Sequence, residues 1–301
     1  MVRSSLYKKP RRKFNFSTFT IVVFVILFIY SLSLILLFGW GFITSLKDQM
    51  SDFRLNTLGF PKEWRWDHYT TALSSLNIKV TTADGTRVVY IEEMFLNSIL
   101  YSVGASIVQT AVTLVMAYLV AKYDNWFSKI IYGIVVVTMI LPIVGSLPSE
   151  INMAKSLGIF DSIFGIFIMR SSFLGIYFLV FHSMFKGISK DYDEAARIDG
   201  ASNLRIMLEV NFPLVKNTVI TVLLLSFIGY WNDFSIPMIY LPTHPTLASG
   251  LYWFNQSTVG SLSNTPMKLA GCMVVVIPIL IIFIIFNNRI MGNISTGGIK
   301  E

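Results

Sequence analysis

A charged segment at residues 191–202 reads DYDEAARIDGAS and combines several carboxylates with one arginine. Membrane phosphotransferases of the CDP-alcohol class use a motif that begins Asp-Gly-x-x-Ala-Arg and continues with further aspartates. Asp199 and Gly200 could begin it, but Asn203 and Leu204 stand where alanine and arginine are required, and no aspartates follow at the right spacing. The sequence therefore excludes this chemistry and leaves the charges for another use.

Local rules predict that the segment forms a short helix. Asp191 can act as the N-cap, and Glu194 can close a capping box by reaching back to the Asp191 N–H. The helix is predicted to continue to Asp199, and Gly200 follows where a left-handed residue commonly ends a helix.

A second short helix is predicted directly after this glycine corner. Ser202 can cap it, and Leu204, Met207 and Leu208 recur at the spacing of one helical face. Pro213 is predicted to end it. The sequence thus predicts two short helices joined at Gly200.

This shape has two interpretations. Ala195 and Ala196 expose little side chain, so another protein could approach the backbone closely, while Glu194 and Arg197 could fix the register through paired charges. The segment would then be a rigid knob that docks into a partner's cleft. The alternative is an ordinary solvated helix in a loop, and the segment alone favours that alternative.

Aromatic loops offer a second kind of chemistry. The aromatic residues of EWRWDHY at 63–69 could stack on a sugar ring, whereas HPTLASGLYWFNQ at 244–256 is again aromatic but fits an interfacial or re-entrant segment better than a catalytic loop. An interfacial aromatic belt or a surface that docks a partner is the favoured interpretation of the first. No acid occurs between Phe234 and Lys268, so paired-carboxylate catalysis is excluded in the second loop.

Asp233 is an ionisable residue in a long apolar run, and such residues are functional candidates. With Trp231 and Asn232 it is a candidate for the solute pathway. A structural ion pair or a helix cap before Pro237 explains Asp233 equally well. The single cysteine, Cys272, excludes disulfides within the chain and a metal site built from cysteines, and we predict no metal.

The elements that must position these residues are membrane spans. The chain is 54% hydrophobic and 14% charged, where a soluble domain carries about 25% charged residues. We therefore predict an all-α, multi-pass membrane protein in a lipid bilayer. Six runs are predicted to span it: Phe19–Leu46, Phe95–Ala121, Ile130–Leu147, Ile163–Phe185, Thr218–Leu241 and Leu269–Asn287.

Basic residues predict the orientation. Six of them precede the first span without any acid, and the other segments expected on the same side of the membrane carry nine more, against eight in the external segments, most of which lie in one long loop that also contains acids. Both termini, and the loop at 186–217, are therefore predicted to be cytoplasmic. The first apolar run is too long for a cleaved signal peptide. This arrangement explains the net charge of +7 without nucleic acid as a partner.

EAARIDG at 194–200 and VNFP at 210–213 resemble the signature of bacterial binding-protein-dependent ABC importer permeases. Glu194, the two alanines, Gly200 and Pro213 match that pattern at the right spacing. Val210 and Phe212 replace isoleucine and leucine, and both remain apolar.

Further stretches resemble the carbohydrate branch of the family, specifically its maltose-system-type second permease. These stretches are FLNSI at 95–99, WNDF at 231–234, TLASGL at 246–251 and GGIKE at 297–301. The resemblance covers roughly residues 60–301.

The resemblance implies a MetI-like permease fold. Its expected parts are residues 1–92 with the first span and a long external loop, a core of five spans at 93–289 and a cytoplasmic tail at 290–301. The loop at 186–217 would hold the coupling helices that dock on a cytoplasmic ATPase, with Glu194, Ala195, Ala196, Arg197, Asp199, Gly200 and Pro213 as the coupling residues.

The resemblance also implies the partners: a second and different permease, two ATPase subunits, an extracellular solute-binding protein and a carbohydrate. The chain has no P-loop motif, so ATP and Mg²⁺ would be used by the partner, and this subunit would be neither an enzyme nor a cofactor carrier. Import of an amino acid, peptide or polyamine is the alternative. A proton-coupled secondary transporter is less favoured, because only Asp233 lies deep in a span.

Overall fold

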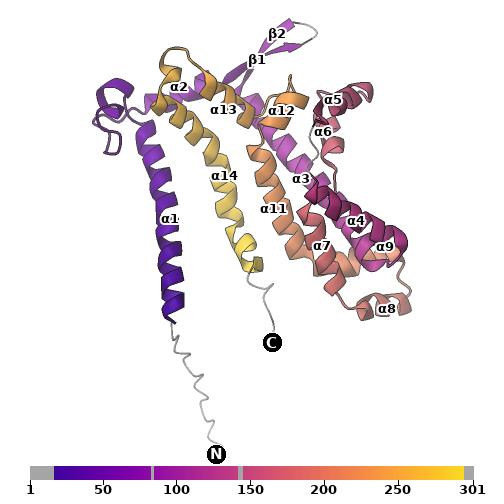
Figure 1. The fold of residues 1–301 in the computed structure, drawn as a ribbon. Helices are drawn as coiled ribbons and strands as arrows, with labels where there is room; N and C mark the ends of the chain where they lie inside the picture. Colours follow the sequence, from indigo (N-terminus) through magenta and orange to yellow (C-terminus); the bar gives the residue numbers. More distant parts are fainter. Residues whose placement is uncertain (1–16, 83–84, 142–144, 295–301) are drawn as a thin grey trace, which may run out of the picture.

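The structure is a computed structural model that describes residues 17–82, 85–141 and 145–294. The basic cluster before the first span and the terminal GGIKE lie outside the described residues. In Figure 1 the helices form an elongated bundle, with α1 at one edge and α4, α7 and α8 gathered at the other.

Within the residues that the structure describes, three helices are long and apolar enough to cross a membrane. They are α1 (Thr18–Ser45), α3 (Ile91–Lys122) and the first 21 residues of α14 (Thr265–Ile294). They correspond to the first, second and sixth predicted spans. Most residues of α1 are exposed, because this helix packs mainly against α14 at one side, and its apolar surface suits a lipid environment.

The third predicted span is shorter than expected and begins earlier. Helix α4 covers Trp126–Ile140, whereas the prediction was Ile130–Leu147. Asn125 decides the start, because its side-chain oxygen accepts a hydrogen bond from the Ser128 N–H. A separate helix, α5 (Leu147–Ser156), follows. Pro142, in the intervening segment, lies outside the described residues.

The prediction of one continuous fourth span is wrong. The structure has two helices, α6 (Ile163–Arg170) and α7 (Ile176–Gly187). Serines interrupt the run because they bond to local backbone. Ser171 Oγ donates to the Ile168 carbonyl at 2.6 Å, and Ser172 Oγ accepts from the Leu174 N–H at 3.2 Å.

The fifth predicted span is also divided. Helix α11 (Lys216–Asn232) ends at Asp233, and the short helix α12 (Ser235–Tyr240) continues beyond it. At its other end, α11 meets the loop helices of Asn203–Leu214 at a bend of 77°. That bent pair counts as one possible further span.

The remaining elements lie in the loops. They are the π-helical turn η1 (Gln49–Phe53), α2 (Asp67–Ser75), α8 (Lys190–Ile198), α9 (Asn203–Arg205), the π-helical turn η2 (Ile206–Asn211), α10 (Phe212–Leu214), α13 (Leu247–Gln256) and the 3₁₀ turn η3 (Gly260–Ser263).

A β-hairpin is the exception to the all-α prediction. Strands β1 (Asn77–Thr82) and β2 (Gly85–Tyr90) pair in antiparallel fashion, with Val80 opposite Arg87. Both strands are rich in valine and threonine, which favour extended backbone. The valines and threonines indicate strands in the sequence as well, but this pattern is short and stands between two long apolar runs that dominate the local composition.

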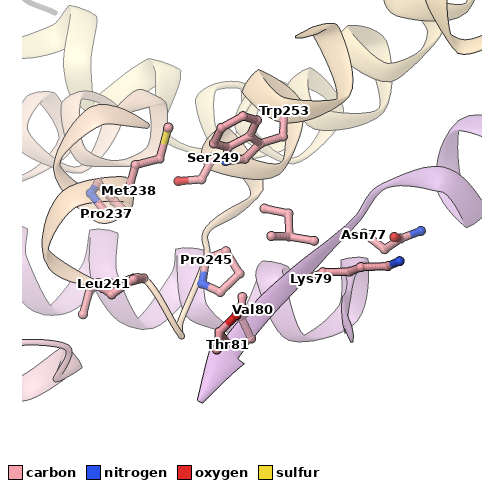
Figure 2. Close-up of a pocket in the computed structure, with 12 residues that line it drawn as sticks. Asn77, Lys79, Val80, Thr81, Pro237, Met238, Leu241, Pro245, Ser249 and Trp253 are labelled. Atoms are coloured by element: carbon pink, nitrogen blue, oxygen red, sulfur yellow. The ribbon is translucent and has the colours of Figure 1, made fainter. Parts of the chain in front are cut away.

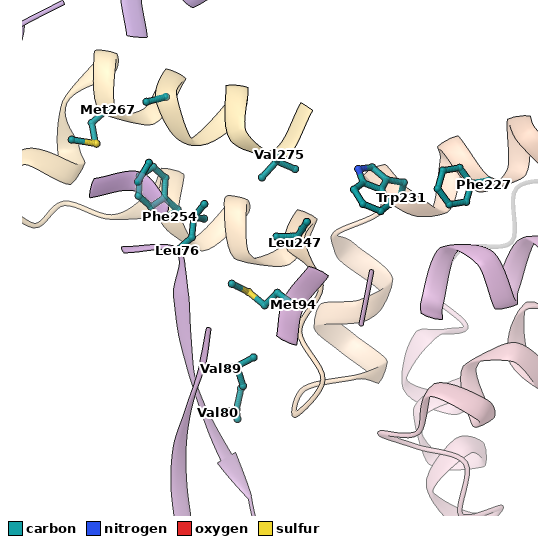
Figure 3. Packing of buried hydrophobic residues seen from close by; sticks show 12 residues of the cluster. Leu76, Val80, Val89, Met94, Phe227, Trp231, Leu247, Phe254, Met267 and Val275 are labelled. Carbon is teal, nitrogen blue, oxygen red and sulfur yellow. The ribbon is translucent and has the colours of Figure 1, made fainter. Parts of the chain in front are cut away.

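The core centres on α3, which packs against α11, α7 and α6. Near the hairpin, Met94, Trp231 and Phe254 belong to one cluster that joins α3, α11, α13 and α14 (Figure 3). A second cluster, around Phe178 and Phe185, fixes α7 and the segment after α8 against the other end of α3. The 186–217 loop is therefore attached to the central helix rather than hanging from the bundle.

Candidate functional site

Helix α8 begins differently from the prediction. Ser189 is the N-cap, with its hydroxyl accepting from the Asp191 N–H at 3.3 Å, so the capping box predicted at Asp191 and Glu194 is wrong. The backbone of Ser189 is extended, and the helix therefore starts at Lys190. Asp191 lies in the first turn, where its negative charge still favours the positive helix start.

The end of α8 confirms the predicted glycine corner. Gly200 has φ +79°, in the left-handed region. The Ala201 N–H donates to the Ala196 carbonyl at 2.9 Å, and the Gly200 N–H donates to the Arg197 carbonyl at 3.0 Å. These two bonds form a Schellman motif, which fixes the direction in which the chain leaves the helix.

The second helix is capped as predicted but ends later. Ser202 Oγ accepts from the Arg205 N–H at 3.4 Å. Pro213 does not end the helix, which continues through α10 to Leu214. The π-helical turn η2 ends two residues before Pro213, and its wider turn accommodates a residue that lacks an N–H. The chain then bends into α11.

The two faces of α8 differ in chemistry. Lys190, Asp193, Glu194 and Arg197 line a groove of about 840 Å³ between α8 and the ends of α3, α4 and α7. Ile198 points away from the molecule and is 87% exposed.

Exposed apolar side chains continue from Ile198 onto the second helix. Tyr192 on α8 is exposed, and so are Leu204 and Leu208 on the second helix. Exposed apolar side chains grouped in this way are typical of a surface that binds a partner.

Nearby, the hydrogen bond and charge of Glu209 raise the pKa of Arg205, whose guanidinium stays protonated.

A buried ion pair ties α8 to the central helix. Lys122 Nζ at the end of α3 lies 2.9 Å from Asp193 Oδ2, and the two side chains are only 8% and 16% exposed. Asn211 of η2 is fully buried and donates from Nδ2 to Asp193 Oδ1 at 2.7 Å. We call this group the Lys122–Asp193–Asn211 clasp. It fixes both helices of the 186–217 loop to the bundle.

The sequence did not identify the clasp. In the sequence, Lys122 counts only among the basic residues that predict the orientation, and Asp193 only among the carboxylates of the 191–202 segment. The available signal was a lysine at the end of a long span and an aspartate in a helix on the same side of the membrane. Only the tertiary structure shows that they meet.

The candidate pathway residues Trp231, Asn232 and Asp233 occupy three different environments. Trp231 is buried in the apolar cluster and packs against Phe95 and Phe227. Asn232 is exposed. Asp233 Oδ1 accepts from the backbone N–H groups of Ser235 and Ile236, each at 3.1 Å.

Asp233 also contacts the central helix. Its Oδ2 accepts a hydrogen bond from the buried hydroxyl of Tyr101, at 3.0 Å. Together with its backbone bonds, this contact makes Asp233 the cap of α12 and a tie between α11 and α3.

Asp233→Asn and Asp233→Ala distinguish the two roles of this residue. Asparagine keeps one oxygen that can accept the two backbone bonds, and its amide can donate to the Tyr101 hydroxyl in place of the bond that hydroxyl now donates, so we expect nearly unchanged thermal stability and uptake if the role is structural. Alanine leaves the Tyr101 hydroxyl without a partner and should cost about 1–3 kcal/mol. Thermal unfolding of the purified protein and uptake assays measure the two effects. Lost uptake in Asp233→Asn at unchanged stability would instead assign Asp233 to the solute pathway.

The aromatic loops lie on the side of the bundle opposite the 186–217 loop. Trp64 and Trp66 stack with their ring centres 6.3 Å apart, and both are exposed. A second groove, of about 570 Å³, lies between β1 and the α12–α13 region (Figure 2). Lys79 and Trp253 lie at its edge. Within the described ranges, no group of three or more His, Cys, Asp or Glu residues could hold a metal ion.

Comparison with known proteins gives a consistent result. Residues 94–296 match the family described as binding-protein-dependent transport system inner membrane component. The chain is 23% identical over 282 residues to the diacetylchitobiose uptake system permease protein NgcG of Streptomyces coelicolor, covering 93% of this chain and 88% of that protein. It is 27% identical over 267 residues to the probable starch degradation products transport system permease protein AmyC of Thermoanaerobacterium thermosulfurigenes, covering 86% and 89%.

Solved structures include a similar fold. A chain from the crystal structure of a bacterial ABC transporter involved in the import of the acidic polysaccharide alginate superposes with a TM-score of 0.72. The sequence identity is 23%, and the match covers 93% of this chain and 99% of that chain.

Proposed function

This chain belongs to the family of binding-protein-dependent transport system inner membrane components, and on that premise we propose that it is a permease subunit of an ATP-driven carbohydrate importer. The 186–217 loop carries the proposal. Its Glu194-Ala195-Ala196 and Gly200 match the family pattern, and the loop presents exposed apolar side chains on helices fixed to the bundle.

The proposed mechanism transfers motion through this loop. On the cytoplasmic side, two ATPase subunits bind ATP and Mg²⁺, and their closure moves the docked loops. Because α8 is clasped to α3 and the second helix bends directly into α11, a displaced loop pulls on both central helices. The permease then changes from an inward-open to an outward-open state, and ATP binding biases that equilibrium.

The other partners complete a transporter with both termini of this chain in the cytoplasm. A second, different permease forms the other half of the translocation path. An extracellular binding protein delivers the solute to the outer loops, where Trp64, Trp66 and Trp253 are exposed. The two relatives are named for the transport of diacetylchitobiose and of starch degradation products, which supports a carbohydrate rather than an amino acid, peptide or polyamine.

Uptake by the reconstituted transporter tests the proposal. The chain is purified with its second permease and ATPase, placed in proteoliposomes and supplied with its binding protein. We expect accumulation of radiolabelled oligosaccharide that requires ATP, and none when the P-loop lysine of the ATPase is replaced. Accumulation driven by a proton gradient without ATP would contradict the mechanism. Accumulation of amino acids or peptides in place of sugars would contradict the assigned solute class alone.

A further inference from the structure

The groove between α8 and the ends of α3, α4 and α7 has more positive than negative charge. Its charged lining comprises Lys122, Lys129, Lys186, Lys190 and Arg197 with Asp124, Asp193 and Glu194. Asp193 is neutralised by Lys122 in the clasp. Asp124 lies 3.6 Å from Lys129, and both are well exposed.

Three cations of the groove remain without such a partner. Among the described residues, no carboxylate oxygen lies within 4.0 Å of Lys186, Lys190 or Arg197, each of which is exposed. Within the described residues, Glu194 is the one acid of the groove that forms no ion pair. The groove therefore keeps a net positive charge that faces solvent.

The position of the groove relative to the membrane follows from α4. At the start of this helix the rings of Trp126 and Phe127 are in contact, with centres 4.0 Å apart and planes tilted by 31°, and both are exposed. Tryptophan and other aromatics gather at membrane interfaces, where an apolar ring meets a polar layer. Ile130, Ile134 and Val137 continue along an exposed apolar face of the same helix. The groove thus opens at the level of the lipid headgroups, beside a face suited to acyl chains.

The groove also contains an apolar floor. Val120 of α3 and Phe185 of α7 are buried beneath the charged rim, and Ile188 is partly buried. Tyr132 and His182 form one wall with their ring centres 4.9 Å apart. A charged rim over an apolar floor matches an amphipathic molecule better than a free inorganic anion.

From these observations we propose that the groove between α8 and the ends of α3, α4 and α7 binds the headgroup of an anionic phospholipid. The phosphate oxygens accept hydrogen bonds from Lys186 and Lys190, and the glycerol and upper acyl carbons lie against Ile188 and the exposed face of α4. Since α8 forms one wall, a bound lipid also restrains the loop that we propose as the coupling element. The proposal requires that the chain spans a membrane, and it is independent of the solute.

Lipid retention by the purified transporter tests this site. The complex is exchanged into nanodiscs of phosphatidylcholine with or without phosphatidylglycerol, and native mass spectrometry counts the lipids that remain bound. The wild type should retain phosphatidylglycerol in preference to phosphatidylcholine. Each lysine near an anionic surface contributes roughly fivefold to lipid binding, so Lys186→Gln with Lys190→Gln should lower retention about 30-fold.

Two control variants make the result interpretable. Lys155→Gln with Lys216→Gln removes the same charge from exposed positions outside the groove and should retain the lipid. Lys186→Arg with Lys190→Arg keeps the charge and should also retain it, which separates loss of the site from loss of fold. Equal retention of both lipids by the wild type, or the same retention in the glutamine variant, would overturn the proposal. ATP-driven uptake could persist in either case, so failure here is distinguishable from failure of the proposed function.

Discussion

Gly200→Val is expected to reduce ATP-driven uptake to background while the chain still inserts and assembles. Gly200 has φ +79°, and a β-branched residue there is strained by roughly 1–2 kcal/mol. The strain falls on the Schellman motif that sets the angle between α8 and the second helix. If the loop docks on an ATPase as we propose, the wrong angle would keep Glu194 and Ala195 out of the partner's cleft, and we therefore expect ATP hydrolysis without transport.

Uptake and ATP hydrolysis in proteoliposomes measure this effect. Gly200→Asn is the conservative variant, because asparagine tolerates the left-handed region, and it should keep most of the uptake. Gly229→Val is the matched control, since a Cβ at Gly229 meets nothing within 4 Å and the residue lies inside α11. Uptake that survives Gly200→Val combined with Glu194→Ala would show that this loop does not couple transport to ATP.

Lys122→Met is expected to have the second large effect. Removing one partner of a buried ion pair leaves the other charge without compensation, which costs on the order of 3–5 kcal/mol. Asp193 would then be left with Asn211 as its hydrogen-bond partner. We expect α8 to separate from α3 and ATP hydrolysis to continue with little uptake, because motion of the loop no longer reaches the central helix.

A charge swap tests whether the clasp acts as a pair. Lys122→Asp with Asp193→Lys should recover part of the uptake, since the swapped lysine could also donate to Asn211 Oδ1, a buried atom that has no hydrogen-bond partner among the described residues. Arg205→Ala with Glu209→Ala removes an exposed ion pair of the same loop and should leave thermal stability nearly unchanged. Lys122→Asp alone and Asp193→Lys alone should be equally defective in uptake. Full uptake in Lys122→Met would contradict the proposed role of the clasp.

Much of the site could be predicted from local sequence. The Gly200 corner and the Ser202 cap were predicted correctly, because each depends on backbone conformation within four residues. The N-cap of α8 was not, because Ser189 and Asp191 both suit that position and the local pattern could not choose between them. The family match confirmed the resemblance that Glu194, Gly200 and Pro213 had suggested. Assignment of individual coupling residues stays a prediction.

The membrane architecture was predicted less evenly. Long uniform apolar runs gave α1, α3 and α14, since length and hydropathy alone define such a helix. The fourth span was predicted as one helix and is two, because the side chains of Ser171 and Ser172 form hydrogen bonds with nearby backbone groups. The hairpin at 77–90 escaped prediction because its valines and threonines are brief beside the apolar runs.

The sequence by itself determined the class of protein, the glycine corner and the capped helix that follows it. These features depend on composition or on neighbours within one helical turn. Only the tertiary structure decided that Lys122, Asp193 and Asn211 meet, that the Tyr101 hydroxyl donates a hydrogen bond to Asp233, and that α8 forms one wall of a basic groove. The physical reason is distance along the chain. Such contacts join residues up to 132 positions apart, and their geometry exists only once α3 has packed against its neighbours.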